Sequence, residues 1–327
     1  MLKSFHMPKT KVGVLRGGPS SEYEVSIKTG EAVLKNMPED YEAVDIFIDK
    51  NGEWHIKGIK HEPQKAIRQV DVIFNALHGE YGEDGQVQEF LDKFGVPYTG
   101  SGAFASRVAM NKALAKTFVA KEGIKTPQYR IISRSSYSPE EALSIFSAFP
   151  LPIVVKPLSL GSSVGVTIAK SLPHLQESID KAFLKSEDVL IEEFIAGREA
   201  TCGVLEKFAG EEFNALPPIE IISKSASGFF DYDAKYNGQS EEICPGRFSV
   251  EEMAEIKRMA STVHKILGLR HYSRSDFMLH PKRGIFFLEV NTLPGLTEAS
   301  LVPKAIKTAG SSLTGLVDHL IKLALKK

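Results

Sequence analysis

The sequence has little of what export, membrane insertion or binding to a polyanion requires. Only two of its 327 residues are cysteines, Cys202 and Cys244, too few for a disulfide framework or a cysteine metal site. No run of about 18 apolar residues occurs, and the opening MLKSFHMPKTK lacks the apolar core of a signal peptide. The 40 basic and 41 acidic residues leave a net charge of −1, which argues against a strongly basic nucleic-acid binder. We expect a soluble, cytoplasmic protein with two reduced thiols and no nucleic-acid or membrane partner.

The first hundred residues alternate segments typical of strands with segments typical of helices. Apolar runs over 11–15, 43–48 and 70–77 indicate strands, and helical periodicity over 22–35 and 85–94 indicates helices between them. Strands separated by helices predict an open parallel α/β sheet. Ligands bind such sheets at the carboxyl ends of the strands.

The rest of the chain mixes strands and helices without an internal repeat. A helical segment is predicted over 101–121, and a hairpin with a glycine-rich loop over 152–169. The polar, weakly periodic stretch 228–246 is predicted to be a long loop. Further strands are predicted near Ala200, Ile219, Asp276 and Phe286, with helices over 250–267 and 313–325.

Four polar residues interrupt two apolar strands near the C-terminus, RSDFML and FFLEVN. Period-two alternation places Arg274 and Asp276 on one face of the first strand, and Glu289 and Asn291 on one face of the second. Two carboxylates about 4 Å apart repel by roughly 4 kcal/mol at an effective dielectric of 20, so a cation or Arg274 must hold them. Oxygen donors without His or Cys suit Mg²⁺. An arginine–carboxylate network on a solvated sheet face would explain the same pattern.

The hairpin loop 161–165 contains two glycines and two serines, whose backbone N–H groups and hydroxyls can surround a phosphate. It is no Walker A loop, and a tight hairpin would use glycines in the same way. Lys156 favours the phosphate interpretation, because a lysine in an apolar strand is costly to bury unless it meets an anion. Lys112, in a helical segment, would by itself be an ordinary solvated lysine.

Near the N-terminus, the segment GGPSSE follows a strand and opens a helix. It lacks the G-x-G-x-x-G spacing, which argues against a nicotinamide enzyme. Glu22 in the first helical turn would complement the helix dipole without any further role. His78 ends another strand of the same sheet and should lie at the same edge as Glu22, although a lone histidine there is usually structural.

Seven segments, in this order along the chain, resemble the D-alanine–D-alanine ligases of the ATP-grasp superfamily. They are GGPSSEYEVS, ALHGEYGEDG, PYTGSGAFASRVAMNK, VVKPLSLGSSVGV, VLIEEFIAGREAT, FFDYDAKY, and DFML followed by LEVNTLPGLTEASLVPKAIKTAG. The resemblance implies an α/β (α+β overall) ATP-grasp fold with an N-terminal open parallel α/β domain. It further implies an N-terminal substrate-binding domain at 1–100, a central ATP-grasp subdomain at 101–193 and a C-terminal ATP-grasp domain at 194–327.

The resemblance also implies an ATP-dependent ligation of two D-alanines for peptidoglycan precursor synthesis. The first D-alanine would be phosphorylated to an acyl phosphate, and the amine of the second would attack it. The cofactors would be ATP and two Mg²⁺ ions, with Mn²⁺ as a substitute. The partners would be D-alanine and ATP, and the enzyme would be a homodimer.

The resemblance assigns a role to each matching residue. The residues implied to hold the ATP phosphates are Lys112, Lys156, Gly161, Ser162 and Ser163. Those implied to bind adenine and ribose are Glu192, Glu193, Ile195 and Glu199. The metal ligands would be Asp276, Glu289 and Asn291, and the oxyanion would be stabilised by Arg274 and the Gly295 N–H. Glu22 would bind the first D-alanine, and His78 would lie near it. Ser300 and Leu301 would bind the second D-alanine. Lys235 would contact the transferred phosphoryl group, and Tyr236, linked to Glu22 and Ser162, would close the site.

Two departures from the family pattern affect the second-substrate site and the phosphate loop. Glu298 and Ala299 precede Ser300 where many members carry another polar pair, and Ser159–Leu160 precede the glycine loop where some carry charged residues. One alternative is a ligase with D-lactate or D-serine as second substrate, and Tyr236 argues against D-lactate. Another alternative is a non-catalytic nucleotide-binding homologue, against which the presence of every metal and phosphate residue argues.

Overall fold

The chain folds into two compact units in a computed structural model that describes residues 8–159, 165–223 and 240–326. One unit comprises residues 1–103, 270–272 and 293–327, so it is built from both ends of the chain. The other comprises residues 104–269 and 273–292. Among the described residues, no helix combines the length and the hydropathy needed to cross a bilayer.

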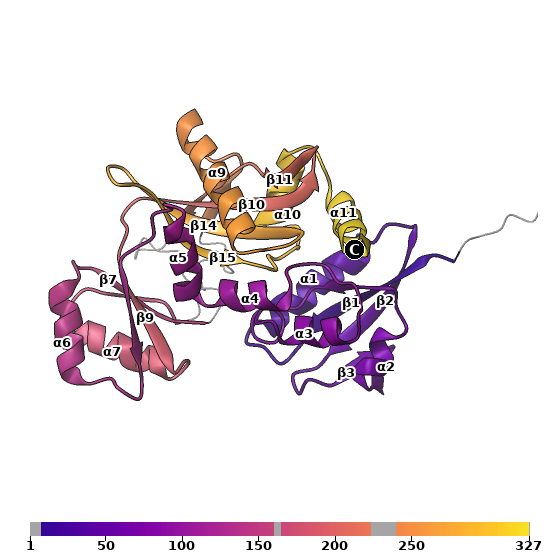
Figure 1. Cartoon of the computed structure of the whole chain (residues 1–327), viewed down its shortest axis with the longest axis horizontal. Coiled ribbons are helices and arrows are strands. Elements are labelled where there is room, and N and C mark those ends of the chain that lie inside the picture. Colours follow the sequence, from indigo (N-terminus) through magenta and orange to yellow (C-terminus); the bar gives the residue numbers. More distant parts are fainter. Residues whose placement is uncertain (1–7, 160–164, 224–239, 327) are drawn as a thin grey trace, which may run out of the picture. The chain divides into compact units, whose positions relative to one another are not determined.

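A five-stranded sheet lies at the centre of the first unit, in the order β4-β3-β2-β1-β5 (Figure 1). Its strands are β1 (Thr10–Gly17), β2 (Tyr41–Ile48), β3 (Trp54–Ile56), β4 (Ile59–His61) and β5 (Val72–Asn75). Strand β1 pairs in parallel with β2 and β5, which confirms the predicted parallel α/β sheet. The prediction missed β3 and β4, which pair antiparallel at one edge of the sheet. Their pairing is antiparallel because short turns connect them to their neighbours, and a short turn cannot form the crossover that parallel strands need.

Helices complete the first unit and cover its sheet. They are α1 (Tyr23–Lys35), α2 (Pro63–Ile67), α3 (Gln86–Lys93), α10 (Leu301–Thr308) and α11 (Leu313–Leu325). Leu15, Ile46 and Trp54 of the sheet form a buried core with Ile67 of α2 and Leu91 of α3. The carboxyl ends of β1 and β5 lie next to one another, because Leu15 is in register with Asn75. The loops that carry Glu22 and His78 leave the sheet from these ends.

The second unit contains two sheets. The smaller sheet, in the order β6-β9-β7-β8, is antiparallel throughout and has helices α6 and α7 packed on it (Figure 1). Its elements are β6 (Tyr129–Ser133), α6 (Pro139–Ala148), β7 (Ile153–Pro157), β8 (Thr167–Ala169), α7 (Leu172–Phe183) and β9 (Asp188–Glu193). The pairing of β7 with β8 confirms the predicted hairpin. Val155 and Ile191 belong to the helix-packed core, so alternation directs Lys156 and Glu192 to the opposite face.

The larger sheet runs in the order β13-β12-β10-β14-β15, with β11 paired to β10. Its strands are β10 (Arg198–Phe208), β11 (Glu211–Ala215), β12 (Ile219–Ser223), β13 (Ser240–Ile243), β14 (Tyr272–His280) and β15 (Gly284–Asn291). The accompanying helices are α4 (Ala103–Met110), α5 (Lys112–Lys121) and α9 (Val250–Ile266). Phe277 and Phe287 are fully buried beneath α5 and α9, together with Val119 and Met259.

Two predictions of local structure were wrong in part. The helical segment 101–121 is two helices, because Asn111 leaves the helical conformation and its side chain accepts the N–H of Leu114 to cap α5. The predicted loop 228–246 contains β13, which gains its hydrogen bonds from β12, a partner that local periodicity does not reveal. The part of this stretch before Ser240 lies outside the described residues.

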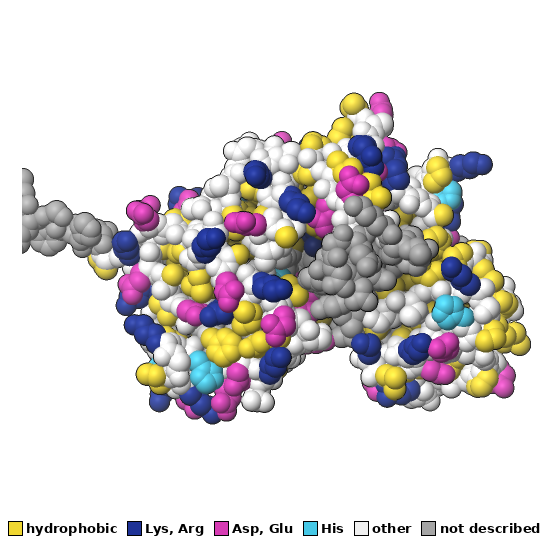
Figure 2. Space-filling model, turned by 180° about the vertical axis from the view of Figure 1, so that it is seen from behind, with side chains coloured by type: hydrophobic (Ala, Val, Ile, Leu, Met, Phe, Trp, Pro, Cys, Tyr) yellow, Lys and Arg dark blue, Asp and Glu magenta, His cyan; other side chains and the backbone are white. Residues whose placement is uncertain are grey.

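The surface and the cysteines agree with the composition. Acidic and basic side chains are interspersed over the described part of the face seen in Figure 2, in keeping with the near-zero net charge. No disulfide joins Cys202 and Cys244, which confirms the predicted thiols. Cys202 is buried, and burial raises the pKa of its thiol to about 12.

Candidate active site

In the first unit, Glu22 and His78 are brought together by the ends of β1 and β5. Glu22 is the residue before α1 and is 6% exposed, while His78 is 4% exposed and its Nε2 lies 2.9 Å from the Thr29 hydroxyl. A Cβ added to Gly79 would lie 2.9 Å from Oε2 of Glu22, so this carboxylate lies against the backbone that follows His78. The predicted proximity of Glu22 and His78 is therefore confirmed. A carboxylate with so little exposure suits a ligand that carries an ammonium group.

Also in the first unit, the predicted second-substrate residues meet at the start of α10. Ser300 precedes the helix, Leu301 is its first residue, and the Ser300 hydroxyl lies 2.8 Å from that of Thr297. A Cβ on Gly295 would lie 3.0 Å from the Ser300 Oγ, so the two residues are neighbours. The N–H groups of a helix start favour an anionic group such as a carboxylate.

Glu83 links these loops and was missed by the sequence analysis. One of its carboxylate oxygens accepts the N–H of Gly79 at 2.9 Å, and the other accepts the N–H of Leu293 at 3.0 Å. The side chain is 8% exposed. Glu83 thereby ties the loop of His78 to the segment that leads to Gly295. Its place in the segment HGEYGEDG was the only signal available, and spacing alone does not distinguish it from its acidic neighbours.

In the second unit, the four polar residues on β14 and β15 converge as predicted. Asp276 is paired in register with Glu289, and Arg274 with Asn291. Arg274 donates two hydrogen bonds to Asp276, at 3.0 and 2.9 Å, and the Asn291 amide donates a third at 3.4 Å. Thr201, which the sequence analysis missed, donates its hydroxyl to the same carboxylate at 2.6 Å. Both explanations of the pattern, an arginine network and a cation site, are consistent with this arrangement.

The donor set on these strands fits a hard cation. Asp276, Glu289 and Asn291 offer only oxygen ligands from neighbouring positions of two paired strands. Lys112 places its ammonium 3.4 Å from Oε2 of Glu289, so a phosphate-binding candidate contacts a metal-binding candidate. Lys112 and the metal-binding candidates therefore belong to one patch of the second unit.

Lys156 and Glu192 form the other charged cluster of this unit, together with Lys116. The Lys156 ammonium lies 2.8 Å from one oxygen of Glu192, and the Lys116 ammonium lies 3.0 Å from the other. Burial alone would raise the pKa of Glu192, but the two ammonium groups lower it below its ordinary value, so this carboxylate is ionised. Lys116 was not predicted, although it follows Lys112 by four residues and so lies on the same helix face.

The remaining predicted nucleotide residues that the structure describes lie on β9 and β10 or between them. Glu193 accepts two hydrogen bonds from Arg283, at 2.7 and 2.9 Å, which lower the pKa of its carboxyl group. Ile195 is buried in a small apolar cluster with Met278 and Phe286, which suits the face of an aromatic base. Glu199 is half-buried on β10. Five predicted residues lie outside the described ones: Gly161, Ser162, Ser163, Lys235 and Tyr236.

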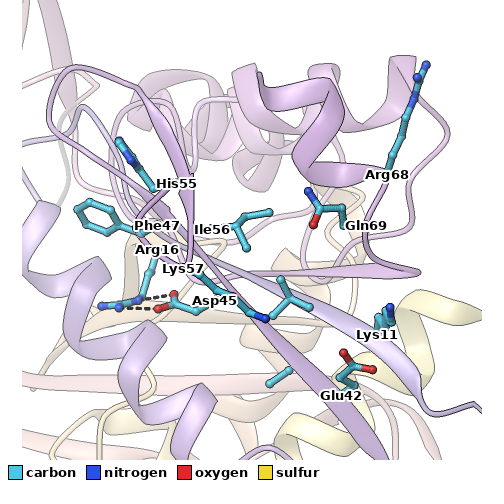
Figure 3. A pocket seen from close by; sticks show the side chains of 13 residues that line it. Lys11, Arg16, Glu42, Asp45, Phe47, His55, Ile56, Lys57, Arg68 and Gln69 are labelled. Atoms are coloured by element: carbon cyan, nitrogen blue, oxygen red, sulfur yellow. Dashed lines mark hydrogen bonds and ion pairs between the residues drawn. The ribbon is translucent and has the colours of Figure 1, made fainter. Parts of the chain in front are cut away.

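A separate hollow of about 880 Å³ lies along β2 in the first unit (Figure 3). Its lining includes Lys11, Arg16, Asp45 and Arg68, and Arg16 donates two hydrogen bonds to Asp45, at 2.7 and 2.8 Å. None of the predicted site residues lines it. It is therefore distinct from the groups around Glu22 and Ser300 in the same unit.

Comparison with known proteins gives consistent matches over nearly the whole chain. A family model described as "D-ala D-ala ligase C-terminus" matches residues 118–322, and one described as "D-ala D-ala ligase N-terminus" matches residues 11–66 and 56–101. A D-alanine–D-alanine ligase of Geobacter sulfurreducens is 40% identical over 316 residues, covering 95% of this chain and 93% of that protein.

Solved structures also resemble the chain. A D-alanine–D-alanine ligase of Bacillus anthracis, complexed with ATP, superposes with a TM-score of 0.78 at 30% identity, covering 97% of each chain. The VanG D-Ala:D-Ser ligase of Enterococcus faecalis gives a TM-score of 0.82 at 31% identity, covering 97% of this chain and 100% of that one.

Proposed function

The chain belongs to the D-alanine–D-alanine ligase family of the ATP-grasp superfamily, and we propose how its residues carry out that activity. The enzyme is an ATP-dependent ligase that joins two D-alanines through an acyl phosphate and serves peptidoglycan synthesis. The observation that best supports the assignment of residues is the contact of Lys112 with Glu289, at 3.4 Å. It joins one phosphate candidate and one metal candidate on a single patch of the second unit.

In the proposed reaction, the second unit binds the nucleotide. Lys112 and Lys156 hold the phosphates, while Ile195 packs against the adenine and Glu199 binds the ribose. A carboxylate is a poor electrophile, so the γ-phosphoryl group is first transferred to the carboxylate of one D-alanine, with release of ADP. Catalysis of this step relies on positioning and on neutralising phosphate charge. The amine of the second D-alanine then displaces inorganic phosphate and forms the peptide bond.

The first unit would hold the amino acids. Glu22 binds the ammonium of the first D-alanine, with His78 beside it. Ser300 and the N–H of Leu301 bind the carboxylate of the second D-alanine, because a helix start favours a negative charge. Gly295 would donate its N–H to the tetrahedral oxyanion, and the resemblance alone gives the same role to Arg274 of the second unit.

Asp276, Glu289 and Asn291 are proposed to hold two Mg²⁺ ions, with Mn²⁺ as a substitute. Their all-oxygen donor set supports this assignment. The ions would neutralise charge on the triphosphate. Arg274 donates two hydrogen bonds to Asp276, which hold the carboxylate of this proposed ligand in place.

Some proposals rest on family membership alone. These are a homodimer, a cytoplasmic location in keeping with the use of ATP, and three domains at 1–100, 101–193 and 194–327. Light scattering after gel filtration would test the dimer.

Tyr236 and Lys235, outside the described residues, keep their roles by resemblance only. Tyr236 would favour an amine as nucleophile. Tyr236→Phe should then raise D-alanyl-D-lactate relative to dipeptide when D-alanine and D-lactate compete at fixed pH.

The main test is product identification. Phosphate release from ATP is measured with D-alanine, with L-alanine, and with D-alanine plus either D-lactate or D-serine, and the products are identified by mass spectrometry. We expect D-alanyl-D-alanine as the main product and no turnover of L-alanine. A preference for D-alanyl-D-serine, as in the VanG relative, would move the chain to the D-serine branch of the family. Absence of any ADP formation would favour a non-catalytic homologue.

A further inference from the structure

Lys116 is a fully buried lysine in the proposed nucleotide site, and the phosphate assignments above do not use it. It lies on α5 with a side chain that is 0% exposed. Its ammonium contacts Glu192 at 3.0 Å, donates to the carbonyl of Phe287 at 3.5 Å and lies 5.9 Å from the centre of the Phe287 ring. A buried ammonium is costly unless a specific partner offsets its desolvation, so its presence here needs an explanation.

The partner that Lys116 contacts is shared with Lys156. Each oxygen of the Glu192 carboxylate takes one ammonium, at 3.0 Å for Lys116 and 2.8 Å for Lys156. The Lys156 side chain is 9% exposed, whereas those of Lys116 and Glu192 are 0% and 3% exposed. Lys156 is therefore the member of this trio that a ligand can reach most easily.

The charges of the trio do not cancel. Two ammonium groups and one carboxylate leave one net positive charge, whereas Lys156 and Glu192 without Lys116 would be neutral together. We propose that Lys116 is a positioning residue: by sharing Glu192, it prevents this carboxylate from neutralising Lys156, whose charge is then available to the phosphates of ATP. The inference rests on the proposed nucleotide site and adds to it a residue that does not touch the nucleotide.

The protonation of Lys116 agrees with this role. The pKa of Lys116 is lowered from its ordinary 10.5 to about 8, because burial outweighs the opposing effect of Glu192, and Lys156 adds to the lowering. Among the described residues, the charged groups that act on Lys116 are Glu192 from β9, Lys156 from β7 and Glu289 from β15. Lys116 is thus charged at neutral pH, and it loses that charge in mildly alkaline solution.

The test compares variants that lose the charge of Lys116 in different ways. Lys116→Met keeps the apolar stem, and Lys116→Gln keeps a hydrogen-bond donor for Glu192. Lys121→Met, on the exposed last turn of the same helix, is the matched control. The readouts are the Kd for MgATP without D-alanine, kcat at saturating ATP, and KM for D-alanine.

Both Lys116 variants should bind MgATP on the order of tenfold more weakly, since a unit charge is lost close to the phosphate site. Their kcat and their KM for D-alanine should change less than about threefold, because only nucleotide binding is affected. Lys121→Met should match the wild type. Adding Glu192→Gln to Lys116→Met should restore much of the MgATP affinity that Lys116→Met alone loses, because Lys156 is then no longer neutralised. A purely structural lysine would give no such rescue.

The wild type gives a second measurement that needs no variant. Its MgATP affinity should fall between pH 7.5 and 9.5, as Lys116 loses its proton. Any of three results would overturn the inference. The first is a folded Lys116 variant with wild-type MgATP affinity, and the second is a loss of MgATP affinity that Glu192→Gln does not reverse. The third is a wild-type MgATP affinity that does not change between pH 7.5 and 9.5. If the wild type itself fails to bind MgATP, the proposed nucleotide site is wrong and not only the role of Lys116.

Discussion

Glu192→Gln offers the sharpest test of how the buried charges in the second unit are balanced. The substitution keeps the size of the side chain and removes a carboxylate that contacts both Lys116 and Lys156. Removing one partner of a buried ion pair leaves an uncompensated charge, at a typical cost of about 3–5 kcal/mol. Here the cost is limited, because one of the two lysines can release its proton.

The limit follows from the pKa of Lys116, about 8 in the folded protein against an ordinary value of 10.5. At pH 7, releasing that proton costs about 1.4 kcal/mol, one pKa unit, so Lys116 contributes no more than this to the loss. Lys156 loses a charged hydrogen bond, worth about 1.5–3 kcal/mol. We therefore expect Glu192→Gln to lower the free energy of unfolding by about 3 kcal/mol at pH 7.

At pH 9 Lys116 is already neutral in the folded wild type, so the loss should be smaller by about 1 kcal/mol. The pH dependence of the wild-type free energy of unfolding has the matching sign. Because the unfolded chain holds the Lys116 proton up to about pH 10.5 while the folded one releases it near 8, this residue makes stability rise with pH within that window. Replacing Lys116 by Met should remove this rise.

The assay is urea-induced unfolding at pH 7 and pH 9. The matched control is Glu141→Gln, which breaks the exposed pair with Arg130 and should cost no more than about 1 kcal/mol at either pH. Equal losses for Glu192→Gln and Glu141→Gln would refute the reasoning, and so would a larger loss at pH 9 than at pH 7.

Three further predictions concern the phosphate, metal and thiol groups. Lys156→Met should weaken MgATP binding and lower the rate with little loss of thermal stability, since removing a buried charge offsets its lost hydrogen bond, the apolar stem is kept and Glu192 keeps Lys116 as partner; a collapse of stability with unchanged affinity would make Lys156 structural. Glu289→Gln should abolish turnover and leave the fold intact, and near-normal turnover at millimolar Mg²⁺ would refute its role as a ligand. Cys202 should resist a thiol reagent in the native protein and react after denaturation, because burial keeps it protonated; rapid native labelling at Cys202 would contradict this.

The sequence by itself determined the alternation of strands and helices and much of the chemistry. Period two along RSDFML and FFLEVN was enough to place Arg274 with Asp276 and Glu289 with Asn291, since alternation is a property of every extended strand. Glu22 and His78 were likewise predicted to be neighbours, because parallel strands end at a common edge. Helix 313–325 was predicted with the bounds that it has, as its apolar periodicity is strong.

Only the tertiary structure decided how charges from distant segments are shared. Lys116 looks like any helix lysine in the sequence, and it is distinctive only because β9 brings Glu192 to 3.0 Å from it. The same holds for Glu83, whose two N–H donors lie in loops more than two hundred residues apart, and for Thr201 at Asp276. Periodicity reports which face of an element a side chain occupies, but not which other element covers that face. The partner of a buried charge is therefore set by packing between segments that local sequence patterns do not connect.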